Sequence, residues 1–199
     1  MNVLRVGITG GIGSGKTTTC KLFELMGIPV YYADDRAKWL MQHDKNLIAQ
    51  LRDAFGDQVY NSEGQLDRAY LAGIVFNDRS QLDILNGIVH PAVRADGIAW
   101  DEEHTTTPYT LREAALLYES GIYQLLDKII TVTAPEALRI ERVMQRDNVD
   151  EAAVRARIDK QWPEEKKVAL ADFVIHNDGQ QSLIRQVYHI HQQLIQQSS

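Results

Sequence analysis

Short apolar runs alternate with longer stretches of helical periodicity along this chain. In the helical stretches apolar residues recur three and four positions apart, as at Leu47, Leu51 and Phe55. The short runs are rich in β-branched and aromatic residues, which are typical of buried strands. The runs expected to form five strands are residues 3–9, 29–32, 109–118, 128–133 and 173–176. Strands that alternate with helices predict an α/β fold with a parallel sheet and helices on both faces.

The connecting stretches differ in length and charge. Residues 60–104 look mainly helical, broken at His90-Pro91, where the proline is expected to open a new helix. A charged helical stretch follows the fourth strand and lasts to about residue 167, and a closing helix is expected at 180–196. Ligands of parallel sheets bind beyond the carboxyl ends of the strands, so the residues after each strand are the candidates for function.

The stretch GITGGIGSGKTTTC at residues 7–20 contains a complete P-loop pattern, Gly10-x4-Gly15-Lys16-Thr17, between a predicted strand and a predicted helix. Glycines let backbone N–H groups turn inward around a phosphate, and the helix N-terminus adds partial positive charge. Lys16 is expected to reach the β- and γ-phosphates, and the Thr17 hydroxyl to ligate Mg²⁺. A glycine-rich turn with a chance Lys-Thr pair is the alternative, which pattern and context together disfavour. The residues expected to hold the nucleotide here are Gly11, Ile12, Gly13, Ser14, Gly15, Lys16, Thr17 and Thr18.

Composition narrows the class of protein further. The chain has 199 residues, a formal net charge of −6 and one cysteine, Cys20. This length fits a single domain, and a negatively charged chain is not expected to bind nucleic acid or anionic membranes broadly. The sequence has no apolar run near the ~18 residues of a membrane span and no secretory pattern at its start. We therefore expect a cytoplasmic protein, either a monomer or a weak homo-oligomer.

A nucleotide-binding loop is compatible with a switch, a motor or a kinase. A GTPase would need a guanine-reading Asn-Lys-x-Asp segment, which this sequence lacks, and a motor normally needs a longer chain. A small kinase needs a carboxylate near the γ-phosphate and cations on a closing lid. Asp34 follows the second strand and is a candidate base that orients an acceptor hydroxyl. A helix cap is an equal alternative for Asp34.

Arginines gather on the charged helical stretch. Arg139, Arg142 and Arg146 are spaced so that three guanidinium groups share one helix face. Planar guanidinium groups are suited to transferring phosphates, which favours a lid over the donor site. Glu136 and Asp147 support the alternative, a solvated and salt-bridged face.

Two further segments carry candidates for binding an acceptor. Arg94 follows His90-Pro91 by about one helical turn, and a surface arginine at a helix start is its plainer interpretation. Glu119 follows a predicted strand and is suited to hold Mg²⁺ through water, with a helix cap as the alternative.

With these pieces placed, the chain resembles the dephospho-coenzyme A kinase family nearly from end to end. The stretches that carry the resemblance are TGGIGSGKT at 9–17, VYYAD at 30–34, HPxxR at 90–94, LLYE at 116–119, RVMxRD at 142–147 and ADFVIxN at 171–177. The chain departs from the family pattern at Tyr32, where the family often has aspartate, and at Ala115, where it commonly has proline. The P-loop is shared by many families, whereas the six stretches together are specific.

The resemblance implies a P-loop kinase core with a helical acceptor-binding insertion at about 60–104 and a lid at about 140–165. It implies transfer of the ATP γ-phosphate, with Mg²⁺, to the ribose 3′-hydroxyl of dephospho-coenzyme A, giving coenzyme A and ADP in the last step of coenzyme A biosynthesis. The residues that it assigns to catalysis are Thr9, Lys16, Asp34 and Arg142. Those that it assigns to the nucleotide, beyond residues 11–18, are Arg142, Arg146, Asn177 and Gly179. Those that it assigns to the acceptor are Asp34, His90, Arg94 and Glu119, with Thr17 for Mg²⁺.

Two other functions stay open on the residues alone. A small P-loop kinase for another hydroxyl, such as a nucleoside or a sugar acid, is the nearer one, and the HPxxR segment argues against it. The other is a nucleotide-binding regulatory module that transfers no phosphate, which an ATP assay with and without acceptor distinguishes.

Overall fold

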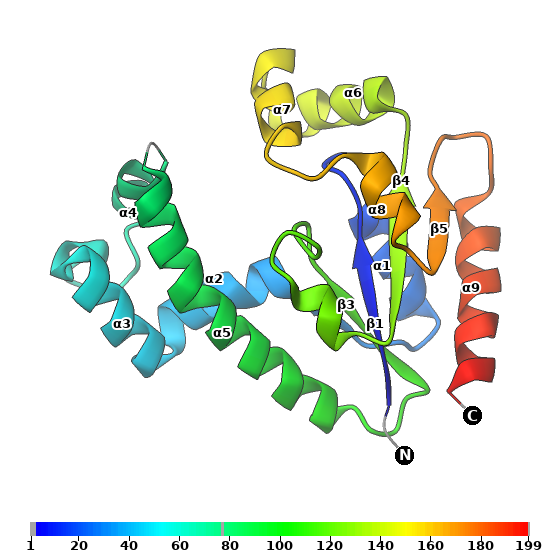
Figure 1. The fold of residues 1–199 in the computed structure, drawn as a ribbon, viewed down its shortest axis with the longest axis horizontal. Coiled ribbons are helices and arrows are strands. Elements are labelled where there is room, and N and C mark those ends of the chain that lie inside the picture. The colour runs from blue at the N-terminus through cyan, green and yellow to red at the C-terminus, as the bar shows by residue number, and fades with distance from the viewer. Residues whose placement is uncertain (1–2, 77, 199) are drawn as a thin grey trace. The chain divides into compact units, whose positions relative to one another are not determined.

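The computed structural model describes residues 3–76 and 78–198. They form two compact units: Met1–Tyr32 together with Trp100–Ser199, and Ala33–Ala99. The first unit is built on a five-stranded sheet in the order β2-β3-β1-β4-β5, with every neighbouring pair parallel (Figure 1). The strands are β1 (Leu4–Thr9), β2 (Val30–Tyr32), β3 (Tyr109–Glu113), β4 (Lys128–Thr133) and β5 (Phe173–His176). The predicted α/β fold with a parallel sheet is therefore confirmed.

One predicted strand is shorter than expected. The run at 109–118 was predicted to be extended throughout, but β3 ends at Glu113 and a turn follows. Leu117 and Tyr118 in that turn are buried, so apolar character there reflects packing rather than strand pairing. The methyl groups of the Leu117 side chain lie close to Gly7 on β1, so this turn covers one face of the sheet.

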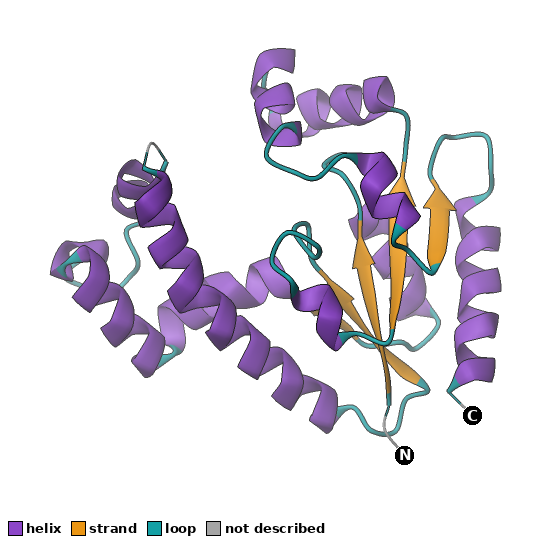
Figure 2. Cartoon of the chain, viewed as in Figure 1, coloured by secondary structure: helices purple, strands orange, loops and turns teal. Residues whose placement is uncertain are grey.

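Helices cover both faces of this sheet (Figure 2). α1 (Lys16–Leu25) and α9 (Leu183–Gln197) pack together, and their buried side chains share one core with β1, β3, β4 and β5. Phe23 of α1 meets Tyr109 of β3 edge to face, with the ring centroids 6.4 Å apart. The remaining helical segments of this unit are η2 (Ile122–Leu125), α6 (Glu136–Asp147), α7 (Glu151–Ile158) and α8 (Glu164–Ala169).

The second unit is helical. It contains α2 (Ala33–His43), α3 (Lys45–Phe55), η1 (Asp57–Val59), α4 (Arg68–Val75) and most of α5 (Arg79–Glu103). Asp44 and Asp67 cap α3 and α4 by accepting from the backbone N–H groups of Leu47 and Tyr70. The helical insertion predicted at about 60–104 falls mostly within this unit, whose helices begin earlier, at Ala33.

The predicted helix start at His90-Pro91 is wrong, because α5 continues through Pro91. Proline removes one backbone hydrogen bond and crowds the carbonyl four residues earlier, which here belongs to Gly87. Val89 and Val93, on either side of the proline, are buried. Burial of these side chains holds the helix together across the missing bond, since most helical stability in proteins comes from packing.

Within the described part of the chain, no helix is both long enough and apolar enough to cross a membrane.

Candidate active site

The glycine loop connects β1 to α1 and has the geometry of a phosphate cradle. Gly13 and Gly15 have φ angles of 80° and 93°, and α1 begins at Lys16 with no side chain capping its first turn. The amide of Ser14 donates to the Gly11 carbonyl at 3.0 Å, which closes the turn. A Cβ atom on Gly13 would lie 2.4 Å from the backbone oxygen of Arg139, so a side chain there would displace α6. Glycine is required at this position both for its backbone angle and for this close approach.

Lys16 forms an ion pair with a carboxylate. Its Nζ lies 3.0 Å from Oε1 of Glu113, and both side chains are largely buried. Glu113 is the last residue of β3 and is opposite Ile8 of β1, which brings it beside the loop. Glu113 is a charged residue in a strand whose five residues are all buried, which signals a partner because buried charges are usually paired.

The neighbouring charge on β3 is explained in the same way. Arg112 is buried and pairs with Asp101, which lies in the last turns of α5. Successive side chains of a strand point to opposite faces, so Arg112 and Glu113 need separate partners.

Two hydroxyl groups beside the loop are buried without a hydrogen-bond partner. Oγ1 of Thr9, at the end of β1, and Oγ of Ser14 make no hydrogen bond to the described residues. Buried hydroxyls are nearly always hydrogen-bonded in proteins. These two are therefore free to donate to an oxygen of a ligand bound at the loop.

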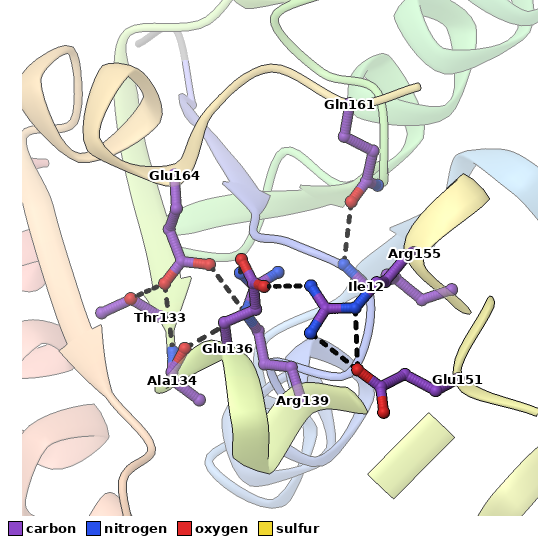
Figure 3. A network of polar contacts seen from close by, with 9 residues as sticks. All are labelled: Ile12, Thr133, Ala134, Glu136, Arg139, Glu151, Arg155, Gln161 and Glu164. Carbon is purple, nitrogen blue, oxygen red and sulfur yellow. Dashed lines mark hydrogen bonds and ion pairs between the residues drawn. The ribbon is translucent and has the colours of Figure 1, made fainter. Parts of the chain in front are cut away.

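The three arginines of α6 have different environments, although their spacing predicted one shared face. Arg139 is buried, and its Nε donates to the Ala134 carbonyl and lies 3.1 Å from Oε2 of Glu164 (Figure 3). Arg142 donates to the Asn177 carbonyl at 3.0 Å and approaches that of Gly13 at 3.5 Å. Arg142 and Arg139 thus both lie against the loop, but the Arg139 guanidinium is also bound to Ala134 and Glu164.

Arg146 lies at the exposed end of α6. Its Nε is 2.7 Å from Oδ1 of Asp147, and its side chain is 62% exposed. Hydrogen bonds from Arg146 and Arg157 lower the pKa of the Asp147 carboxyl to about 2. Asp147 therefore stays ionised and holds Arg146 at physiological pH.

Asn177 joins the end of β5 to the loop. Its side-chain Nδ2 donates to the backbone carbonyl of Ser14 at 2.8 Å, while its backbone carbonyl accepts from Arg142. Gly179 follows two residues later with a φ of 80°, so the chain turns there. The structure brings Asn177, Arg142 and the loop together.

Glu119 lies in the turn after β3 and caps no helix. Its Oε1 accepts from the backbone N–H of Trp162 at 2.7 Å and lies 2.9 Å from Nζ of Lys167, which is fully buried. The Trp162 ring stacks on Tyr118 with centroids 5.9 Å apart. Lys167 and Trp162 were missed by sequence reasoning, because nothing in the local sequence marks a pairing across 40 residues or more.

The remaining candidates belong to the second unit. Asp34 is exposed and is the second residue of α2, so it lies inside the first turn rather than at the residue before it. Its charge suits the positive end of the helix dipole. His90 and Arg94 lie one turn apart on α5, and burial lowers the pKa of the His90 imidazole.

Tyr32 ends β2, where the family often has an aspartate. Burial and the hydrogen-bonded carboxylate of Glu24 raise the pKa of its phenol. The position therefore offers a neutral hydroxyl, and Asp34 is the first carboxylate after the strand.

Mg²⁺ fits this site only together with nucleotide phosphates. Among the described residues, no group of three or more His, Cys, Asp and Glu side chains could hold a metal ion. Mg²⁺ commonly binds through one or two protein ligands and the phosphates of a substrate. The exposed Thr17 hydroxyl in the first turn of α1 matches that chemistry.

A parallel sheet that carries a P-loop after β1, a paired lysine and an arginine-bearing helix over the loop defines a P-loop kinase. Comparison with known proteins supports this class and narrows it. The family model for dephospho-CoA kinase matches residues 4–182. The chain belongs to the dephospho-CoA kinase family.

Matches to individual proteins support the same family. A dephospho-CoA kinase from Salinibacter ruber is 44% identical over 176 residues, which is 87% of this chain and 88% of that protein. One from Bacteroides fragilis is 38% identical over 92% of this chain and 89% of its own length. Among solved structures, a protein from Thermus thermophilus matches with a TM-score of 0.85 and 32% identity, covering 97% of this chain and 98% of that one. The dephospho-CoA kinase from Campylobacter jejuni matches with a TM-score of 0.72 and 27% identity over 98% of both chains.

These matches confirm the family, the kinase fold and the activity predicted from the sequence. The reaction is ATP-dependent phosphorylation of the ribose 3′-hydroxyl of dephospho-coenzyme A, which yields coenzyme A and ADP as the last step of coenzyme A biosynthesis.

Proposed function

We propose that the loop, Lys16 and Arg142 hold and neutralise the phosphates of ATP while an acceptor hydroxyl attacks the γ-phosphate. The observation that carries this proposal is the position of Arg142, bound to the carbonyl groups of Gly13 and Asn177 and therefore at the rim of the loop. Lys16 exchanges Glu113 for the β- and γ-phosphates, where its charge opposes the charge of the transition state. Arg146 leaves Asp147 and adds a second guanidinium group when the lid closes.

Asp34 is the general base of the proposal. The 3′-hydroxyl oxygen forms a bond to the γ-phosphorus as the bond from that phosphorus to the ADP oxygen breaks, and the hydroxyl proton passes to the Asp34 carboxylate. The free hydroxyl of Thr9 donates to an oxygen of the transferred phosphate. Thr9 is the last residue of β1 and Asp34 comes two residues after β2 ends, and ligands of such folds bind beyond the carboxyl ends of the strands.

Mg²⁺ would be held by the Thr17 hydroxyl together with the phosphates of the donor. When bound, it neutralises the charge on the phosphates. Once Lys16 turns to the phosphates, the Glu113 carboxylate would be available to help hold Mg²⁺ through water.

The helical unit is proposed to bind the acceptor. Arg94 is exposed on α5 and carries the charge that a pyrophosphate group requires, with His90 one turn before it. Glu119 is also proposed to serve the acceptor, and its carboxylate fixes the segment at Trp162. Asn177 and Gly179 form part of the adenine pocket. We propose further that the protein works in the cytoplasm without nucleic acid, as a monomer or weak homo-oligomer.

The test is a panel of acceptors with Mg-ATP, in which ADP release and the phosphorylated product are both measured. Release is expected to rise strongly with dephospho-coenzyme A alone, and chelation of Mg²⁺ should abolish it. Comparable kcat/KM for a nucleoside, gluconate or shikimate would refute the acceptor assignment. Release that no acceptor stimulates would instead support the regulatory module.

The role of Arg94 is tested by Arg94→Ala, which should raise the KM for dephospho-coenzyme A more than that for ATP. Arg68→Ala is the matched control, an exposed arginine of the same unit. Equal KM values for dephospho-coenzyme A in both variants would remove Arg94 from the acceptor site.

A further inference from the structure

One backbone N–H of the phosphate loop is bound by a side chain from a distant part of the chain. The Ile12 amide donates to Oε1 of Gln161 at 2.9 Å, across 149 residues of sequence (Figure 3). Gln161 lies between α7 and α8. By contrast, the amides of Gly13, Gly15 and Lys16 have no acceptor among the described residues, which leaves them for phosphate oxygens.

The hydrogen bond from the Ile12 amide fixes the orientation of the peptide plane between Gly11 and Ile12. The peptide between Gly11 and Ile12 carries the Gly11 carbonyl, which accepts from the Ser14 amide at 3.0 Å, and the Ile12 N–H, which donates to Gln161. Both ends of the same plane are therefore held. Because glycines flank Ile12 on both sides, the backbone alone restricts this plane very little.

The segment that carries Gln161 is fixed by the contacts of its neighbour, Trp162. The next residue, Trp162, donates its backbone N–H to Glu119 at 2.7 Å and stacks its ring on Tyr118 at an interplanar angle of 6°. Glu119 in turn is paired with the fully buried Lys167 of α8. The contacts of Trp162 and Glu119 already order this part of the backbone. Ordering the Gln161 side chain therefore costs less conformational entropy.

We propose that Gln161 is a positioning residue for the donor phosphates, one that fixes the Gly11–Ile12 peptide so that the loop is ordered before ATP binds. A loop held in its binding geometry spends less binding energy on ordering, which strengthens nucleotide binding. It also keeps the γ-phosphate in the geometry for transfer. The opposite role, a plug that ATP must displace, predicts the opposite change in affinity.

The experiment compares the wild type with Gln161→Ala, Gln161→Met and Gln161→Glu, with Gln145→Ala as control. Gln145 is an exposed glutamine of α6 that contacts only Glu141 among the bonds of the described residues. Met keeps the length of the side chain without the acceptor oxygen, and Glu keeps the acceptor. Three quantities are measured: hydrogen exchange at the Ile12 amide without nucleotide, the Kd for ATP and ADP, and the KM for both substrates.

Loss of the acceptor in the Ala and Met variants should speed exchange at Ile12 and raise the Kd for ATP and ADP by about two- to tenfold, the worth of one neutral hydrogen bond. The KM for ATP should rise alongside, with little change for dephospho-coenzyme A. Gln161→Glu should restore slow exchange at Ile12, and Gln145→Ala should match the wild type throughout.

An unchanged or lower Kd for ATP in the Ala and Met variants would overturn the proposal, the lower value in favour of the plug. Unchanged exchange at Ile12 would overturn it as well. The proposal rests on ATP binding at the loop, but exchange and nucleotide affinity are measured without an acceptor. If the acceptor assignment fails, the exchange rates and nucleotide affinities would therefore still test the role of Gln161.

Discussion

Replacing Glu113 by glutamine should destabilise the nucleotide-free protein measurably. The change keeps the shape of the side chain but leaves the Lys16 ammonium without its counter-charge, which lies 3.0 Å away. Breaking one side of a buried ion pair costs about 3–5 kcal/mol. The Lys16 and Glu113 side chains are 13% and 9% exposed, so some water reaches the charge and we expect about 2–3 kcal/mol. For a chain of this size that corresponds to a fall in Tm of roughly 4–12 °C.

The measurement is thermal unfolding of Glu113→Gln, Lys16→Gln and the double variant. Because the double variant removes both charges, it should recover part of the loss, with a coupling of at least about 1 kcal/mol. Glu151→Gln is the matched control: it breaks an exposed pair with Arg155 and should change Tm little. A fall of less than about 2 °C for Glu113→Gln, or additive single changes, would refute the assignment of Glu113 as the resting partner of Lys16.

Three further outcomes follow from the site and the core. Asp34→Asn should lower kcat by about 10²–10⁴ with nearly unchanged nucleotide affinity; Asp35→Asn is its control, and equal kcat in both would reduce Asp34 to a residue of the helix start. Arg142→Ala should raise the KM for ATP and lower kcat together, and unchanged values would leave Arg142 a purely structural contact. Burial lowers the pKa of His191, which is hydrogen-bonded to Tyr109 at 2.8 Å. The unfolded chain therefore takes up this proton first, near pH 6.5, and stability should fall as the pH drops below that value. His191→Gln should flatten the dependence of Tm on pH between 7.5 and 5.5, and an unaltered slope would contradict the assignment.

Most of the fold could be predicted from the sequence because its signals are local. Each strand is a short apolar run, and the glycine loop sits between the first strand and a helix whose buried residues are Thr19, Cys20 and Phe23. The failures have one physical cause. Apolar residues in the turn after β3 and on both sides of Pro91 are buried by packing with distant segments, so local patterns gave the wrong boundary.

The residues of the site also differ in whether their signals are local in the sequence. The P-loop residues and Arg142 belong to motifs in which a few neighbouring positions carry the chemistry, so the sequence alone is enough to make them candidates. Gln161 and Lys167 act through partners far away in the chain, and neither residue type is unusual in a charged helical stretch. The roles proposed for Asp34 and Arg94 stay predictions, since they depend on an acceptor.

β3 shows how such partners become visible in a sequence. All five of its residues are buried, yet two adjacent ones, Arg112 and Glu113, are charged. Neighbours on a strand face opposite sides of the sheet, so no single partner can serve both, and a buried strand with two adjacent charges requires two ion pairs. Asp101 supplies one on one face, and Lys16 supplies the other at the carboxyl edge. A charge at the last position of a strand beside a P-loop strand therefore points to the P-loop lysine, and this inference needs only the sequence and the order of the sheet.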